Sequence, residues 1–445
     1  MKKISPLKRI IVSTMLFLVL AVGASASAEQ LPIVFVHGNG DYAALWTTTI
    51  WRFETNGYDP DLLFAVNMVH PIAPGDDTKP AENQSTTVDQ ASQLASFVTR
   101  TLLTTGKDKV ILVGSSRGGN TIRNYVKFAG GHAVTAMAIL CGTPNHGVFA
   151  APAVLNSEWN GMGYFLARLN AISEVHPDVL FVTTRSDTND KYAQPTGEFI
   201  GQPGKPTGVD SKSPELRGAL NLVLPGLDHR EVAFHQDAFK EIFRVITGRA
   251  PSKLDIVPED KAVLNGMLCG SANGWYTNLP LAGVKVEVYE VNPNTGERQG
   301  DAVRSIITAD DGMWGPFSAD PEAYYEFVAE ASGYPTTRFY LTPFPRSSSY
   351  IHFRLDPLAA EHEEAGAVVI LSRPRGYLGH GRDKFLLDGE VPAGVSEGVP
   401  GTASATKIYS PGASRAVKVV LNKEAVTVKI YPEDNGHKIF VPFHY

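Results

Sequence analysis

The sequence has few cysteines: 445 residues contain only Cys141 and Cys269. These two residues fall in regions that we expect to be different domains, so a disulfide framework is excluded as the source of stability. Both thiols are expected to be buried as small apolar side chains. Because the spacing of cysteine and histidine matches no zinc site, we expect no metal and no cofactor.

The chain also lacks a surplus of basic residues. Its 40 lysines and arginines are outnumbered by 46 acidic residues, which gives a formal net charge of −6. This balance excludes the basic footprint of a nucleic-acid-binding protein, and no basic run resembles a membrane-surface patch. With 445 residues the chain is too long for one hydrophobic core, so two or three domains are expected.

An apolar run stands near the N-terminus, at residues 11–23. Basic residues come before it, and the small residues "ASASA" follow it. This order is typical of a secretory signal peptide, and the run is short for a membrane span. We expect residues 1–28 to be cleaved, which makes the mature protein secreted or periplasmic with no membrane span. An uncleaved N-terminal anchor is the alternative.

Between residue 31 and about residue 248, apolar runs alternate with amphipathic segments. Helical spacing of apolar residues predicts helices such as 88–102 and 239–246. Continuous apolar strands separated by helices indicate a mostly parallel sheet covered on both faces. We therefore expect an α/β domain at residues 29–250. Its strands are predicted over 32–38, 62–68, 109–115, 133–142, 178–186 and 219–226.

After Pro251 the helical periodicity ends, and short alternating segments appear between turn signals such as "NPNTG" and "SPGAS". This all-β region is expected to form one or two small sandwich or barrel units. We place a β-sandwich domain at residues 251–356 and a second β unit at residues 357–445. Strands are predicted over 284–291, 324–331, 349–355, 367–372 and 416–422.

The stretch "VILVGSSRGG" places Ser116 at the centre of the pattern G-x-S-x-G. An apolar strand leads into the pattern and a helix leads out, so the serine falls on a tight turn whose flanking glycines avoid collision. Such a turn exposes the hydroxyl at a helix N-terminus, where N–H groups stabilise negative charge. Ser116 is therefore a candidate nucleophile. A simple turn rich in small polar residues is the alternative.

A nucleophilic serine needs a histidine as base and a carboxylate that orients this histidine. In this topology the chain order is serine, acid, histidine, each placed after a strand. His229 follows the strand expected at 219–226 and is the candidate base. Asp187 and Asp190 both follow the strand expected at 178–186. We favour Asp190 as the acid and keep Asp187 as the alternative.

Two loops are expected to supply backbone donors for an oxyanion. One donor is the N–H of Arg117, the residue after the candidate nucleophile. The other is the N–H of Asn39, in the "VFVHGNGD" loop that follows the first strand. A plain glycine turn is the alternative for this second loop.

Residues 148–175 are rich in large apolar side chains. Phe149, Trp159 and Phe165 are candidates for a lid or an acyl-binding wall over the serine. A pair of ordinary buried helices, packed on the sheet, is the alternative for this segment. Apolar content alone does not choose between the two.

The motifs "FVHGNGD", "VGSSRGG", "TRSDTND" and "LDHRE" together resemble the α/β-hydrolase superfamily. Within it, the chain is similar to secreted bacterial lipases, whose "GTP" loop with a nearby histidine appears here as "CGTPNHG", with His146 one place later. The layout resembles an archaeal lipase with a C-terminal β-domain, including a "DIVP" segment before the β region. Cys141 stands where that relative carries its acid. Because a thiol cannot stabilise an imidazolium, the acid is expected after the next strand, which supports Asp190.

The segment "PLAGVKVEVYEVNPNTGER" separately resembles a carboxypeptidase-regulatory or transthyretin-like β-sandwich, which implies a structural or adhesive module. The main resemblance implies a secreted carboxylic ester hydrolase, most simply a lipase whose substrate is an acylglycerol or another fatty-acyl ester. One alternative is an esterase or depolymerase whose β domains dock a polymeric ester through exposed aromatic residues. Another is a non-enzymatic surface adhesion protein. The candidate docking aromatics are Trp275, Tyr276, Trp314 and Tyr340, for which burial in the core is an equal alternative.

Overall fold

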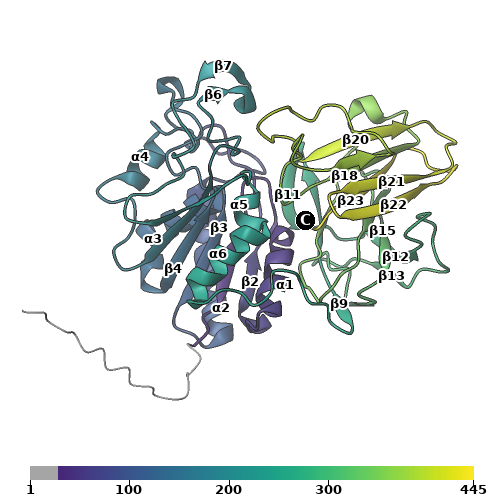
Figure 1. Ribbon diagram of the computed structural model, residues 1–445, viewed down its shortest axis with the longest axis horizontal. Coiled ribbons are helices and arrows are strands. Elements are labelled where there is room, and N and C mark those ends of the chain that lie inside the picture. The colour runs from purple at the N-terminus through teal and green to yellow at the C-terminus, as the bar shows by residue number, and fades with distance from the viewer. Residues whose placement is uncertain (1–28) are drawn as a thin grey trace, which may run out of the picture.

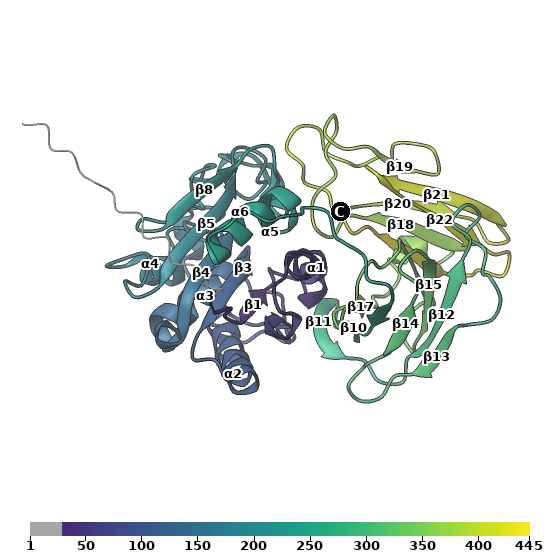
Figure 2. The same cartoon turned by 60° about the horizontal axis from the view of Figure 1, so that its bottom comes forward.

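The computed structural model describes residues 29–445, and the expected signal peptide at residues 1–28 lies outside the described residues. The chain forms an α/β part that ends with helix α6 (Gln236–Thr247) and a β part that follows it. The two parts lie side by side (Figures 1 and 2). Across residues 29–445, no helix is long and apolar enough to cross a membrane.

A six-stranded parallel sheet forms the centre of the α/β part, with strand order β2-β1-β3-β4-β5-β8. Each strand falls within one of the six apolar runs, so the predicted α/β fold is confirmed. A short antiparallel hairpin lies outside this sheet and consists of β6 (Thr196–Gly197) and β7 (Gln202–Pro206). The six strands are β1 (Ile33–Val36), β2 (Leu63–Val66), β3 (Val110–Ser115), β4 (Thr135–Cys141), β5 (Leu180–Ser186) and β8 (Leu220–Leu224).

Helices cover both faces of the sheet. Successive residues of a strand point to opposite faces, so each apolar strand packs against helices on both sides. Phe35 of β1 packs in one cluster with residues of α1 and α6, whereas its neighbour Val34 packs with residues of α2 and α3. Helix α2 begins at a capping box formed by Thr86 and Asp89. The remaining helices are α1 (Thr47–Thr55), α2 (Thr87–Thr105), α3 (Arg117–Phe128), α4 (Tyr164–Asn170) and α5 (Glu231–Phe234).

The β part is built around a seven-stranded sheet with order β13-β12-β15-β16-β23-β18-β20. Its strands come from both sides of residue 356. The boundary expected at residue 356, between two β domains, stays a prediction. The seven-stranded sheet nevertheless contains strands from both of these domains. These strands are β12 (Lys285–Val291), β13 (Arg304–Ile307), β15 (Tyr324–Glu330), β16 (Thr337–Leu341), β18 (Ala367–Ser372), β20 (Ser404–Tyr409) and β23 (His437–Pro442).

Three smaller sheets, with orders β11-β10-β17, β14-β9 and β19-β21-β22, complete the β part. Residues of the first two share a core with β12, β15 and β16, and residues of the third share a core with β18, β20 and β23. Their strands are β9 (Ala262–Leu264), β10 (Leu268–Ala272), β11 (Trp275–Pro280), β14 (Phe317–Ala319), β17 (Phe353–Arg354), β19 (Phe385–Leu387), β21 (Arg415–Leu421) and β22 (Glu424–Ile430).

Two of the four aromatic residues considered for docking belong to the core of the β part. Trp314 and Tyr340 are fully buried, so for these two residues the core alternative holds and a docking role is excluded. The indole of Trp314 packs edge-on against Phe327 and donates its N–H to the carbonyl of Ile351, which explains its burial. Trp275 and Tyr276 of β11 are exposed, as the docking alternative requires.

Both cysteines are buried and unpaired. Burial raises the pKa of the Cys141 thiol to about 12, so it is a neutral apolar group in the sheet. The expectation that the cysteines are small core residues is confirmed. Among residues 29–445, no three histidine, cysteine or acidic side chains are grouped so that they could hold a metal ion.

Candidate active site

Ser116 stands on the turn between β3 and α3, with φ 52° and ψ −124°. This backbone conformation is unfavourable for a residue with a side chain and persists because the packing around it fixes the turn. A Cβ on Gly114 would lie 2.8 Å from the carbonyl carbon of Gly118. A Cβ on Gly118 would lie 2.6 Å from the carbonyl oxygen of Val36. The G-x-S-x-G pattern therefore makes the tight strand-to-helix turn that the sequence predicts.

Three of the predicted site residues, which follow β3, β5 and β8, meet at the carboxyl edge of the parallel sheet. The hydroxyl of Ser116 lies 3.0 Å from Nε2 of His229, and Nδ1 of His229 lies 2.9 Å from Oδ2 of Asp190. The side chains of His229 and Asp190 are each 4% exposed. Oδ1 of Asp190 also accepts the N–H of Tyr192 at 2.8 Å. In this order of contacts, the imidazole can accept the serine proton while the carboxylate fixes its tautomer and orientation.

Asp187 has different partners. Its Oδ1 accepts the N–H of Thr188 at 2.7 Å and the N–H of Gly226 at 3.2 Å. These bonds tie the carboxylate to the loop after β8. Of the two candidate acids, the structure brings Asp190 and not Asp187 to the ring of His229.

The loop after β1 passes close to the serine. A Cβ on Gly38 would lie 3.1 Å from Cβ of Ser116, so the backbone of this loop borders the reactive hydroxyl. Arg117 is the first residue of α3, so its N–H has no acceptor inside the helix. In the described chain, the N–H of Asn39 also donates to no backbone carbonyl. Both N–H groups are therefore free of a backbone acceptor, as an oxyanion donor must be, and their role stays a prediction.

His37 supports this loop, a role that the sequence analysis did not assign. Its Nδ1 lies 2.9 Å from the carbonyl oxygen of Gly38, and its Nε2 accepts the N–H of Met68 at 3.0 Å. Burial lowers the pKa of His37 to about 4, so the ring is neutral at pH 7. A neutral imidazole can donate at one nitrogen and accept at the other, which this position requires.

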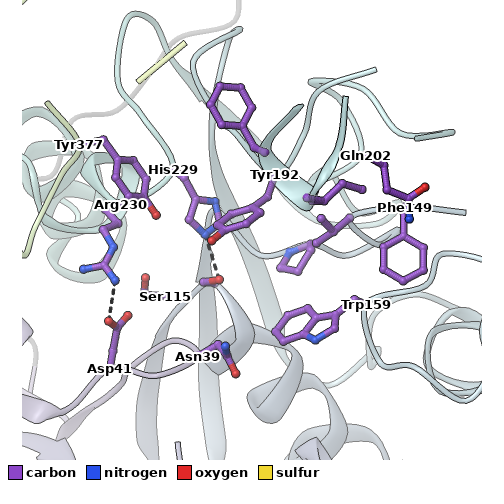
Figure 3. A pocket seen from close by; sticks show the side chains of 15 residues that line it. Asn39, Asp41, Ser115, Phe149, Trp159, Tyr192, Gln202, His229, Arg230 and Tyr377 are labelled. Carbon is purple, nitrogen blue, oxygen red and sulfur yellow. Dashed lines mark hydrogen bonds and ion pairs between the residues drawn. The ribbon is translucent and has the colours of Figure 1, made fainter. Parts of the chain in front are cut away.

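The β part contacts the same loop. Arg354 donates to the carbonyl of Gly40 at 2.8 Å, and the amide of Asn278 donates to the carbonyl of Asp41 at 3.0 Å. The carboxylate of Asp41 in turn pairs with Arg230 at 2.7 Å (Figure 3). Because Arg230 follows His229 directly, this ion pair joins the loop of the candidate base to the loop of the candidate oxyanion donor.

A cavity of about 360 Å³ opens at Ser116. Phe149 and Trp159 line it, as predicted for residues 148–175 (Figure 3). The sequence analysis missed the contribution of the β6–β7 hairpin, which adds Phe199 and Ile200, and that of Tyr377 from the β part. No local pattern could have indicated these residues, because they reach the cavity from segments far away in the sequence.

Phe165 does not line this cavity. It borders a separate hollow beside Thr87 and Val88 of helix α2. Helix α4 buries Leu166 and Leu169, whereas Phe165 is only partly buried. The assignment of Phe165 to the wall over Ser116 is therefore wrong.

The comparisons with known families agree with this site. Residues 30–157 match the family described as lipase (class 2), a range that includes Asn39 and Ser116. The protein is thus a carboxylic ester hydrolase on an α/β-hydrolase fold, and the non-enzymatic alternative is wrong. A second region, residues 261–358, matches the family described as the lipase C-terminal domain.

No relative among the curated proteins matches the sequence. Among solved structures, the mature lipase BlEst2 of Bacillus licheniformis is 20% identical with a TM-score of 0.37, over 51% of this chain and 94% of that one. The propeptide form of BlEst2 is 14% identical with a TM-score of 0.38, over 90% and 92%. The phospholipase PlaB of Legionella pneumophila is 12% identical with a TM-score of 0.33, over 74% and 94%.

Proposed function

We propose that the protein is a secreted serine lipase that cleaves fatty-acyl esters through Ser116, His229 and Asp190. The observation that carries the proposal is the continuous contact from the Ser116 hydroxyl through His229 to Asp190, at 3.0 Å and 2.9 Å. The proposal that the protein is secreted rests on residues 1–28, where basic residues, an apolar run and small residues follow one another.

In the proposed reaction, Oγ of Ser116 attacks the ester carbonyl carbon while Nε2 of His229 takes the hydroxyl proton. The N–H groups of Arg117 and Asn39 bind the oxyanion of the tetrahedral intermediate. His229 then gives its proton to the leaving alcohol, and an acyl-enzyme remains. A water molecule, deprotonated by His229, releases the fatty acid and restores the serine. Asp190 stabilises the imidazolium in both steps.

The cavity supports a fatty-acyl substrate over a small polar ester. Its wall beside Ser116 includes the apolar side chains of Phe149, Trp159, Phe199 and Ile200. Burial of an acyl chain against such side chains is favourable by about 0.8 kcal/mol for each CH₂ group. Longer acyl chains are therefore expected to gain transition-state stabilisation until the cavity is full.

A chain-length series of p-nitrophenyl esters, from acetate to palmitate, tests the proposal. The wild type is expected to prefer medium or long acyl chains, and Ser116→Ala is expected to lose activity on all of them while keeping its melting temperature. Equal activity of the two proteins would refute the nucleophile. A rate that falls steeply beyond acetate would favour the esterase alternative over a lipase.

A further inference from the structure

Two acidic residues, Asp228 and Glu231, fix the backbone on both sides of His229. Oδ1 of Asp228 accepts the N–H of Glu231 at 3.0 Å, and Oε2 of Glu231 accepts the N–H of Asp228 at 2.9 Å. This reciprocal pair has the form of a capping box and begins the helical turn that contains α5. Both residues are buried. The position of His229 therefore depends on where these two carboxylates are held.

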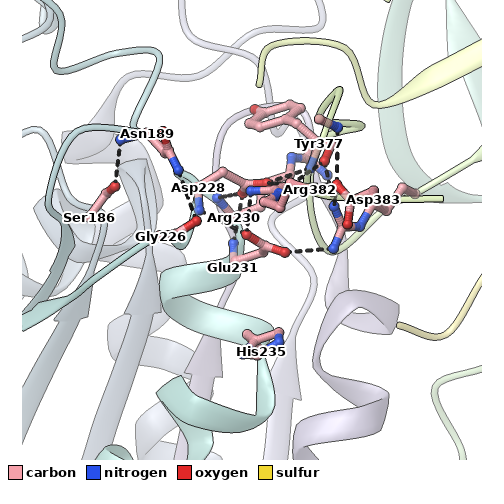
Figure 4. A network of polar contacts seen from close by, with 12 residues as sticks. Ser186, Asn189, Gly226, Asp228, Arg230, Glu231, His235, Tyr377, Arg382 and Asp383 are labelled. Atoms are coloured by element: carbon pink, nitrogen blue, oxygen red, sulfur yellow. Dashed lines mark hydrogen bonds and ion pairs between the residues drawn. The ribbon is translucent and has the colours of Figure 1, made fainter. Parts of the chain in front are cut away.

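The carboxylates are held by the β part (Figure 4). Arg373 donates to Oε1 of Glu231 at 2.6 Å. Arg382 donates to Oε2 of Glu231 at 2.8 Å and to Oδ2 of Asp228 at 3.1 Å. The backbone N–H of Tyr377 donates to the same oxygen of Asp228 at 2.7 Å. We call Arg373 and Arg382 the arginine clamp.

The arginine clamp is itself fixed within the β part. Oδ2 of Asp383 accepts from Arg373 at 2.8 Å and from Arg382 at 3.0 Å. The turn between the two arginines lies directly on the acidic pair, since a Cβ on Gly376 would lie 3.2 Å from Cγ of Glu231. Buried ion pairs of this kind often add little net stability, because desolvation offsets their attraction. Their directional hydrogen bonds nevertheless hold Asp228 and Glu231 in one position. A catalytic base such as His229 needs a fixed position of this kind.

We propose that Arg373 and Arg382 are positioning residues for His229, so that the β part completes the active site of the α/β part. This inference rests on the proposed function, because it assigns the two arginines to the base of that mechanism. A displacement of a reacting group by about 1 Å can lower a rate about 100-fold. Loosening the arginine clamp therefore lowers kcat, while the apolar wall formed by Phe149, Trp159, Phe199 and Ile200, which belong to the α/β part, is left in place.

The test uses the full-length protein with Arg373→Lys and Arg382→Lys, which keep the charge but lose the planar fork of donors. The substrate is soluble p-nitrophenyl butyrate, with kcat, KM and the pH profile of kcat/KM as readouts. We expect kcat to fall about 10- to 100-fold at nearly constant KM. We also expect the acid limb of the profile, which reports the base, to move.

Arg338→Lys is the matched control. Arg338 is an arginine of the β part as buried as Arg373, but it pairs with Glu326 and Asp434 and not with Asp228 or Glu231. We expect this variant to lower the melting temperature and to keep the wild-type kcat and pH profile. All kcat values are taken per folded molecule, as measured by circular dichroism. Should Arg373→Lys not fold, Arg382→Lys carries the test, since the Arg382 side chain is 25% exposed.

Different results would overturn the positioning role and the proposed function. A wild-type kcat and an unchanged pH profile in the arginine clamp variants would overturn the positioning role and leave the proposed function intact. A kcat loss of the same size in Arg338→Lys would also overturn it, because general destabilisation would then explain the effect. Full activity of Ser116→Ala would instead overturn the proposed function.

Discussion

Arg117 and Glu158 form a two-point ion pair, with Nε to Oε1 at 2.5 Å and Nη2 to Oε2 at 2.9 Å. Both side chains are almost completely buried. Oε2 of Glu158 also accepts the N–H and the hydroxyl of Thr87, at 3.0 Å and 2.9 Å. The segment that contributes Trp159 is thus tied to the turn of Ser116 and to helix α2. This arrangement favours a fixed acyl-binding wall over a lid that opens freely.

Glu158→Gln would leave the buried guanidinium of Arg117 without its carboxylate. We expect the free energy of unfolding to fall by about 3 kcal/mol, because an uncompensated buried charge is strongly destabilising. Urea denaturation at pH 7 measures this loss. Glu241→Gln, which breaks the partly exposed pair with Arg244 on helix α6, should lose less than about 1 kcal/mol. Similar losses in the two variants would contradict a special role for the buried pair.

Asp190→Asn keeps the size of the side chain but removes its charge. The amide favours the wrong tautomer of His229, so we expect kcat on a soluble ester to fall about 10⁴-fold. Asp187→Asn should change kcat only a few-fold, since this carboxylate bonds to the N–H groups of Thr188 and Gly226. Steady-state kinetics on p-nitrophenyl butyrate compares the kcat of the two variants. A larger loss of kcat in Asp187→Asn than in Asp190→Asn would make Asp187 the acid.

Trp159→Ala should change the preference for acyl chain length. Removing the indole shortens the apolar wall beside Ser116, so kcat/KM should fall more for octanoate and palmitate esters than for acetate. Phe165→Ala is the control, because Phe165 borders a different hollow. The ratio of the octanoate to the acetate value of kcat/KM is the measurement. An unchanged ratio in Trp159→Ala, or an equal change in Phe165→Ala, would argue against the wall.

His352 should make stability depend on pH. Burial lowers its pKa from 6.5 to about 4, and Nδ1 accepts the N–H of Met267 at 2.9 Å. The folded state keeps this ring neutral, whereas the unfolded chain binds a proton below about pH 6.5. The stability that the neutral ring contributes is therefore complete above pH 6.5 and is lost as the pH falls towards 4.

His352→Asn isolates this effect, since asparagine offers an acceptor to the same N–H and does not titrate. Relative to the variant, the wild type should lose about 1.4 kcal/mol of unfolding free energy per pH unit within that range. Urea denaturation at a series of pH values measures the difference between the two proteins. Groups that titrate in both proteins cancel in this difference. A difference that does not change with pH would show that the pKa of His352 is the same in the folded and the unfolded state.

The sequence predicted the central sheet because its strands are buried on both faces and therefore read as continuous apolar runs. Ser116 was predictable for a local reason, since its turn requires glycines at fixed positions. The choice between Asp187 and Asp190 had no such signal, because both lie in the same short loop after β5. Only the path of that loop decides which carboxylate reaches His229.

Contacts between distant segments account for what the sequence did not reveal. The "LDHRE" motif contains the D-x-x-E spacing of a capping box, but Arg373, the partner of Glu231, lies 142 positions further along the chain. Tyr377 reaches the cavity from the same distant loop. Phe165 was misassigned because apolar spacing in a helix as short as α4 does not show which neighbour each face meets.

The position of β23 in the large sheet bears on the order in which the strands of this sheet can pair. This strand follows all the others in chain order, yet it lies between β16 and β18 and pairs in parallel with both. In a chain that emerges from its N-terminus onward, the two halves of the large sheet stay apart until residues 437–442 arrive. Such late, long-range pairing is slow to form. If residues 373–383 position His229, the candidate base in the α/β part depends on a loop that leaves β18, a strand paired with β23.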